Sequence, residues 1–149
     1  MSYTSLNVHI VFRTKCGVPA VEPEHARTLY NYIWGMTKRR DSTLLRVNGM
    51  PDHLHLFVEL NPKIALADFV CAVKASTSRW MKTCGKFPRF LGWADEYAAF
   101  SYAARDKAMI VAYIKNQQEH HRRVEFADEM KALYAEFGLE EAASHFFRD

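Results

Sequence analysis

The sequence predicts an α+β fold of the ferredoxin-like type, a split βαβ sandwich in which an antiparallel sheet carries its helices on one face. Segments in which apolar and polar residues alternate, as in strands, are interspersed with segments of helical periodicity, in the order β-α-β-β-α-β-α. The 149 residues, 49% of them hydrophobic, suffice for one core and are too few for two independent domains. We therefore expect a single domain over residues 1–149, with a core of residues 3–125 and a C-terminal amphipathic helical tail of residues 126–149.

Each element in the first half of the chain has its own signal. Residues 4–14 alternate and are rich in β-branched and aromatic side chains, which is typical of a strand. Apolar residues recur at helical spacing over residues 24–40, and the three basic residues at the end suit a helix C-terminus. Residues 42–60 predict two strands that meet at residues 48–52, a cluster of turn formers.

The second half of the chain continues the alternation of helix and strand. A second helix is predicted over residues 65–84, and residues 96–104 are strand-like. Residues 105–123 predict a long third helix. Residues 126–137 carry an apolar stripe, which predicts an amphipathic helix broken at Gly138.

The charge of the chain is unevenly distributed. Residues 1–124 hold 18 Lys and Arg against 10 Asp and Glu, a net charge of +8, whereas residues 125–149 hold 2 against 7, a net charge of −5. A basic body attracts polyanions, and an acidic tail can partly mask it, so the charge favours a nucleic-acid partner.

The sequence also bears on the compartment of the protein. The three cysteines are widely spaced and match no zinc or disulfide pattern, so we expect them to be reduced. The chain has no long apolar stretch and no secretory layout at its N-terminus. We therefore expect a cytoplasmic protein with no membrane contact.

Two histidines lie one residue apart in the stretch MPDHLHLFVEL, residues 50–60. Because side chains alternate along a strand, His53 and His55 emerge on the same face, with Cβ atoms about 7 Å apart. Two imidazoles can close that distance to share one metal ion. The alternative is a pair of half-buried histidines that hydrogen-bond to neighbours, but an apolar core offers few partners for their polar atoms. The setting favours metal ligands.

The stretch YIKNQQEHH in the third predicted helix offers a further donor. Tyr113 and Gln117 are four residues apart and so lie on one face of a helix, with Gln117 able to supply a neutral oxygen. Nitrogen and oxygen ligands with open positions suit Mg²⁺ or Mn²⁺ bound together with a phosphate oxygen. Taken alone, the pair could also be a packing tyrosine and a surface amide. His120 and His121 could be cations at a helix C-terminus.

Together, MPDHLHLFVEL and YIKNQQEHH resemble the single-tyrosine transposases of bacterial insertion sequences, of the insertion sequence 200/605 type, in the His-hydrophobe-His endonuclease superfamily. The resemblance extends to NVHIVFRTK, with His9 in the usual place, and to FVCAVKASTSRWM, with Lys74 and Ser78 at familiar positions. WADEYAAFSYA is similar to the strand before the tyrosine helix, so the likeness covers about residues 3–125. One departure is that Lys15 is followed by CGVPAV, where family members commonly have a basic run.

The resemblance implies an enzyme that cleaves single-stranded DNA at hairpin-bearing element ends. Tyr113 would attack a backbone phosphorus to give a 5′-phosphotyrosine and a free 3′-hydroxyl, and another 3′-hydroxyl would then complete strand transfer. Since a phenol is a weak nucleophile at neutral pH, the reaction needs a divalent metal, Mg²⁺ or Mn²⁺, held by His53, His55 and Gln117. Asp52 and His121 are expected to orient these ligands by hydrogen bonding, without contacting the metal themselves. The family also implies a homodimer that exchanges its tyrosine helix.

Binding of a single strand or a hairpin needs a basic surface with aromatic side chains. Trp80 lies among the basic residues of the second predicted helix. The candidates for DNA contact are Arg13, Lys15, Lys74, Arg79, Lys82, Lys86 and Arg89.

Three other functions remain open from the sequence. One is a non-catalytic module that binds single-stranded nucleic acid through a sheet like that of RNA-recognition (RRM-like) domains, although their Lys/Arg-Gly-Phe motif is absent. Another is a domesticated host relative that acts on repeated palindromes. The third, a small-molecule metallohydrolase, needs a water-activating base that the sequence does not reveal.

Overall fold

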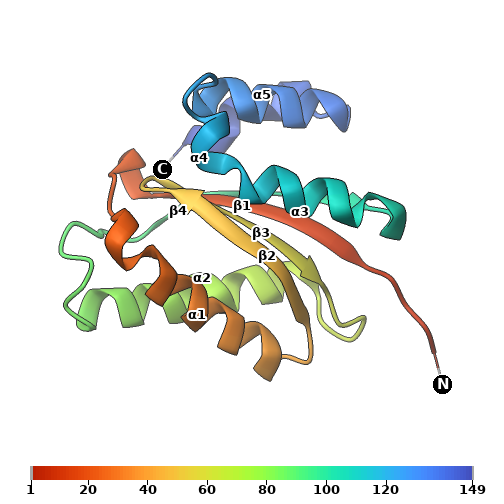
Figure 1. The fold of residues 1–149 in the computed structure, drawn as a ribbon, viewed down its shortest axis with the longest axis horizontal. Coiled ribbons are helices and arrows are strands. Elements are labelled where there is room, and N and C mark those ends of the chain that lie inside the picture. The colour runs from red at the N-terminus through yellow and green to blue at the C-terminus, as the bar shows by residue number, and fades with distance from the viewer. Residues whose placement is uncertain (1, 149) are drawn as a thin grey trace.

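The computed structural model describes residues 2–148 and contains a four-stranded sheet with the strand order β2-β3-β1-β4 (Figure 1). All neighbouring strands pair antiparallel. The strands are β1 (Asn7–Thr14), β2 (Thr43–Met50), β3 (His53–Glu59) and β4 (Trp93–Tyr102). This order and the connection βαββαβ confirm the α+β, split βαβ fold class.

Two helices, α1 (Pro23–Arg39) and α2 (Leu66–Thr83), cover one face of the sheet (Figure 1). The strands send alternate apolar residues to this side, among them Phe12 from β1 and Leu56 from β3. Leu29 of α1 meets them in the same fully buried cluster. This layer is the main hydrophobic core.

The opposite face of the sheet is also covered, by α3 (Lys107–Lys115), α4 (Gln117–His120), α5 (Phe126–Glu136) and a 3₁₀ segment, η3 (Glu140–Phe147) (Figure 1). The expectation of helices on one face therefore holds for α1 and α2 only. The physical reason is that this face is apolar too. Val11, Ala98 and Phe100 pack there against Met130 and Phe146, and they would otherwise be exposed to water.

The third predicted helix is shorter than expected, because α3 ends at Lys115 and a separate turn of helix, α4, begins at Gln117. Asn116 between them departs from helical geometry, with φ −96° and ψ 21°. The side-chain amide of Asn48 on β2 donates to the carbonyl oxygens of Ile114, at 2.9 Å, and Lys115, at 3.1 Å. These contacts satisfy carbonyl groups that the break would leave without partners.

The tail forms the predicted amphipathic helix, α5, which stops before Gly138 at φ 70°. No helix among residues 2–148 is long and apolar enough to cross a membrane.

The turn between β2 and β3 places the histidine strand. A Cβ atom at Gly49 would lie 2.2 Å from the carbonyl oxygen of His53, so only glycine allows the two strands to approach this closely. The backbone N–H of Thr14 donates to the carbonyl oxygen of Asp52 at 2.9 Å, which ties the turn to β1. The strand that carries the histidines is thus held on both sides.

Candidate active site

His53 and His55 lie on the same face of β3, as the two-residue period predicts, and both are buried, with exposed fractions of 1% and 0%. Their ring centroids are 5.2 Å apart. The face they share is the one covered by α3, α4 and α5, whereas Leu54 and Leu56 belong to the core beneath α1 and α2.

One ring nitrogen of each imidazole, Nδ1, is within hydrogen-bond distance of a neighbouring side chain. Nδ1 of His53 is 2.7 Å from Oδ1 of Asp52, and Nδ1 of His55 is 2.8 Å from Nε2 of the buried His9. Asp52 therefore contacts His53, one of the predicted ligands. The Nε2 atoms of His53 and His55 have no hydrogen-bond partner. An imidazole with one nitrogen held and the other free is the usual arrangement of a metal-binding histidine.

Tyr113 and Gln117 come to this pair from α3 and α4. The Tyr113 ring is 6.0 Å from that of His55, centroid to centroid, and Gln117 is fully buried despite its polar side chain. Oε1 of Gln117 has no hydrogen-bond partner. The four residues that the sequence singled out as nucleophile and ligands thus converge within a single chain.

Glu129 of α5, which the sequence analysis did not identify, lies at the centre of the group. It is 2% exposed, and its Oε2 accepts hydrogen bonds from the Tyr113 hydroxyl and from Nε2 of Gln117, the latter at 3.0 Å. Its Oε1 lies 3.3 Å from Nε2 of His55 and 3.7 Å from Nε2 of His53.

His121 completes the cluster, with Nε2 3.1 Å from Oε1 of Glu129. One ligand atom from each of His53, His55, His121 and Glu129 lies within 4.8 Å of every other. A sequence signal for Glu129 did exist, because it follows Phe126 by three residues and precedes Leu133 by four. A carboxylate was thus present on the apolar stripe of the tail helix.

The charges of the site residues follow from burial and from these contacts. Burial lowers the pKa of His55 to about 4. Burial and the Glu129 carboxylate both raise the pKa of Tyr113 above its ordinary value. Burial alone would raise the pKa of Glu129, but the neighbouring imidazoles of His121 and His55 hold it well below its usual range. The site therefore combines a neutral His55, a protonated phenol and an ionised carboxylate.

Among the DNA-binding candidates, Arg13 is placed differently from the expectation. It is 4% exposed, and its guanidinium donates to the backbone carbonyl oxygens of Phe146, at 3.4 Å, and of Phe147 in η3. Arg13 lies on the face of β1 that the tail covers. Its charge is used to anchor the tail, so it is not available on an open surface for DNA.

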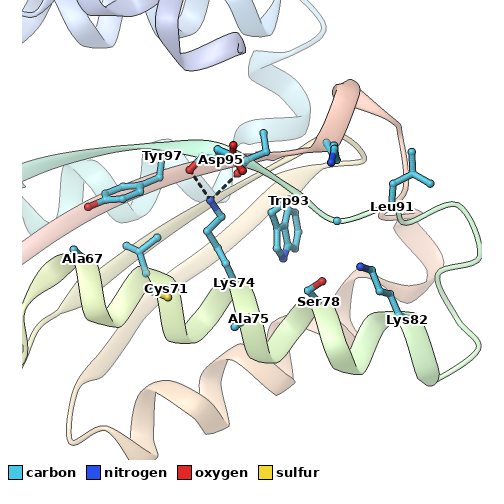
Figure 2. A pocket seen from close by; sticks show the side chains of 14 residues that line it. Ala67, Cys71, Lys74, Ala75, Ser78, Lys82, Leu91, Trp93, Asp95 and Tyr97 are labelled. Carbon is cyan, nitrogen blue, oxygen red and sulfur yellow. Dashed lines mark hydrogen bonds between the residues drawn. The ribbon is translucent and has the colours of Figure 1, made fainter. Parts of the chain in front are cut away.

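Lys15, Lys74 and Lys82 line a groove of about 520 Å³ between α2 and β4 (Figure 2). Nζ of Lys74 donates to the carbonyl oxygens of Ala94, at 2.6 Å, and Asp95, at 3.0 Å. Burial lowers the pKa of Lys74. This lysine is therefore held by the backbone of β4, whereas Lys15 and Lys82 are exposed.

The remaining candidates lie near the same end of α2. Trp80 is engaged in packing, because its ring stacks on Tyr32 with centroids 4.5 Å apart. Three basic side chains are exposed, namely Arg79, Lys86 and Arg89.

The chain is similar to known transposases in sequence and in structure. It is 24% identical over 121 residues to the ISDra2 transposase TnpA of Deinococcus radiodurans, covering 76% of this chain and 85% of that protein. A crystal structure of a putative transposase from D. radiodurans is 26% identical and superposes with a TM-score of 0.62, over 78% of this chain and 93% of the other.

A REP-associated tyrosine transposase bound to a REP hairpin shares the fold, with a TM-score of 0.57 at 15% identity, over 83% of this chain and 73% of the other. The family model described as transposase, IS200-like, matches residues 2–117, which include His53, His55, Tyr113 and Gln117 but neither His121 nor Glu129. Because this match spans most of the chain and includes the convergent site, the chain belongs to the IS200-like transposase family.

Proposed function

We propose that this protein is a metal-dependent transposase that cleaves single-stranded DNA at hairpin-bearing element ends through a covalent tyrosine intermediate. The observation that carries the proposal is that Tyr113 lies beside two buried imidazoles whose Nε2 atoms have no hydrogen-bond partner. A pure binding module has no need for this set of residues. The tyrosine transposase of the same fold that is bound to a REP hairpin supports a hairpin-bearing substrate.

The donor atoms of the site fit a divalent cation. Among the buried side-chain atoms without a hydrogen-bond partner, three belong to the predicted ligands: Nε2 of His53, Nε2 of His55 and Oε1 of Gln117. Such atoms are costly to bury unless something binds them. His53, His55 and Gln117 would hold Mg²⁺ or Mn²⁺, which when bound polarises the phosphate and neutralises the charge that develops on it.

The chain itself supplies the nucleophile and its orientation. The hydroxyl of Tyr113 is fixed by its hydrogen bond to Glu129, and the centroid of its ring lies 6.0 Å from that of His55. In the proposed step the bond from Oη of Tyr113 to phosphorus forms and the bond from phosphorus to O3′ breaks. In net terms the phenolic proton ends on the released 3′-oxygen. Attack by another 3′-hydroxyl reverses these bond changes and releases Tyr113.

The DNA strand would follow the basic end of α2, where Lys15 and Lys82 line the groove of Figure 2 and Arg79 is exposed on the same helix. These cations offer phosphate contacts that do not depend on sequence. We also propose that the protein works as a homodimer in the cytoplasm. The tyrosine of the single chain lies beside its own histidines, and exchange of the tyrosine helix between partners could re-form the same contacts between two chains.

The test uses single-stranded hairpin DNA from the sequence that flanks the gene. Wild-type protein and the Tyr113→Phe variant are incubated with this DNA, with and without Mg²⁺ or Mn²⁺, and resolved on a denaturing gel. We expect a covalent protein-DNA band that requires metal and is absent from Tyr113→Phe. Tyr32→Phe is the matched control, because Tyr32 of α1 packs on the opposite face of the sheet, and it should retain the band.

Two results would redirect the proposal. Tight hairpin binding with no covalent band in either metal, when the true flanking ends are used, would make the protein a binding module. A covalent band with repeated chromosomal palindromes, and none with element ends, would indicate a domesticated host enzyme.

A further inference from the structure

The carboxylate of Glu129 occupies a position in the active site that was not predicted from the sequence. It comes from α5, beyond the residues 2–117 that match the transposase family model. We propose that Glu129 is itself a ligand of the divalent cation, together with His53 and His55. The C-terminal helix α5 is then part of the metal centre. This inference rests on the metal site of the proposed function.

Two of the three distances around Glu129 equal the edges of a coordination sphere, and the third is slightly longer. Two donor atoms that each lie about 2.1 Å from a shared ion, at angles of about 90–110°, are roughly 3.0–3.4 Å apart. Oε1 of Glu129 lies 3.3 Å from Nε2 of His55 and 3.7 Å from Nε2 of His53. Nε2 of His121 is 3.1 Å from the same oxygen. Small shifts of these side chains suffice to enclose an ion.

The atoms on both sides of this gap are ones that a cation would bind. Nδ1 of His53 lies against the carboxylate of Asp52, which leaves Nε2 on the side of Glu129. Nε2 of His53 has no hydrogen-bond partner, and His53 and Glu129 are only 1% and 2% exposed, so bulk water cannot satisfy these polar atoms. A shared metal ion would bind both of them.

The second oxygen of Glu129 connects the metal site to the nucleophile. Oε2 accepts hydrogen bonds from the Tyr113 hydroxyl and from Nε2 of Gln117. With one oxygen directed at the histidines and the other held by Tyr113 and Gln117, the carboxylate orients the phenol relative to the ion. Gln117 thus positions Glu129 through Nε2, while its Oε1 remains without a hydrogen-bond partner and available to the ion. A charged oxygen also suits Mg²⁺ and Mn²⁺ better than a neutral amide does.

The first experiment measures Mn²⁺ binding by calorimetry, without DNA, on the full-length chain. Glu129→Gln preserves the size of the side chain and should lower the affinity at least 100-fold, more than the tenfold to 100-fold loss typical of a supporting residue. Asp128→Asn is the matched control, because Asp128 is exposed on the same helix, and its affinity should stay within twofold of wild type. Circular dichroism and thermal melting in EDTA establish that each variant is folded.

A second measurement needs no variant. Hydrogen exchange of the wild-type amides in residues 126–136 is followed with and without Mn²⁺, with α1 as an internal reference. If Glu129 binds the ion, Mn²⁺ slows exchange throughout α5. Faster exchange in α5 on adding Mn²⁺, or unchanged Mn²⁺ affinity in Glu129→Gln, would overturn the inference and indicate that Glu129 occludes the site and must leave it before metal binds.

The outcomes separate this inference from the proposed function. Wild-type protein that forms the covalent DNA band while Glu129→Gln binds Mn²⁺ normally contradicts only the ligand role of Glu129. Metal binding that depends on Glu129, in a protein that never forms the band, contradicts only the proposed reaction. A wild-type chain that binds no Mn²⁺ contradicts both.

Discussion

At the scale of single residues, His53 and His55 are each oriented by a neighbouring side chain. Asp52 and His9 each occupy the Nδ1 side of one imidazole, so that both Nε2 atoms are left for a ligand. Burial alone would raise the pKa of Asp52, but its hydrogen bond with His53 lowers it. Asp52 is therefore ionised and holds the ring of His53 in one orientation.

Replacement of Asp52 by asparagine should weaken metal binding. The asparagine side chain would keep the shape of the aspartate but lose the charge that fixes the His53 tautomer, and we expect a loss of about 10-fold to 100-fold in Mn²⁺ affinity. Calorimetry is the measurement. Asp41→Asn, an exposed position far from the site, serves as the control. Equal affinities of wild type and Asp52→Asn would show that the turn, and not the carboxylate, positions His53.

The metal-free protein should lose stability as the pH falls from 7 to 5. The pKa of His55 is lowered by burial to about 4, against 6.5 for an unburied histidine. Between these values the unfolded chain binds a proton that the folded chain does not, so acidification favours unfolding. The loss from this residue is about 2 kcal/mol.

Urea unfolding in EDTA at pH 7 and pH 5 measures this loss. His9, whose pKa burial also lowers, acts in the same direction, whereas His121, whose pKa Glu129 raises against the effect of burial, acts in the opposite one. The comparison with His55→Gln isolates the contribution of His55, because this variant should depend less steeply on pH. Parallel pH profiles of the two proteins would rule out a neutral, buried His55 as the cause.

At the scale of elements, the break between α3 and α4 determines where the nucleophile lies. The helix stops at Lys115 because Asn48 of β2 donates to the last carbonyl groups of α3. Gln118 of α4 returns hydrogen bonds to Asn48, at 2.9 Å, and to the carbonyl oxygen of Gly49, also at 2.9 Å. The segment of α3 and α4 that contains Tyr113 is thus hydrogen-bonded to the same β2-β3 hairpin that carries the histidines.

The variant Asn48→Asp tests whether these hydrogen bonds position the nucleophile. It removes the amide that donates to Ile114 and Lys115 and places a negative charge against their carbonyl oxygens. We expect a loss of about 1–3 kcal/mol in the free energy of unfolding, measured with urea, and a slower formation of the covalent DNA band. Asn61→Asp makes the same change in a partly exposed loop and should have little effect. Normal kinetics in Asn48→Asp would mean that the break does not position Tyr113.

At the scale of the whole molecule, the tail converts an open sheet face into an enclosed site. Met130, Leu133 and Phe146 pack over β1 and β4, and the guanidinium of Arg13 anchors η3 through backbone carbonyls. The Tyr113 side chain is thereby held between the sheet and α5. Whether the working tyrosine serves its own chain or a partner is a property of the assembly.

Subunit mixing distinguishes the two arrangements. His55→Ala and Tyr113→Phe should each abolish the covalent DNA band when assayed alone. If the proposed homodimer exchanges its tyrosine helix, a mixture of the two variants restores one complete site in each mixed dimer and the band returns. If the band stays absent although light scattering detects mixed dimers, the tyrosine acts within its own chain.

The sequence alone determined the features that depend on local periodicity. Alternation and helical spacing predicted the order of elements, the shared face of His53 and His55, and the proximity of Tyr113 to Gln117, although the predicted helix breaks between these two at Asn116. These follow from the geometry of the backbone over a few residues, which every strand or helix repeats.

Only the tertiary structure decided which distant residues meet. Long-range packing placed α3, α4 and α5 on the second face of the sheet, ended α3 where Asn48 reaches it, and used Arg13 to hold the tail. It also brought Glu129 to the histidines. Each of these contacts depends on the complementary shape and charge of segments far apart in the chain, and the spacing of residues within one segment carries no information about its partner.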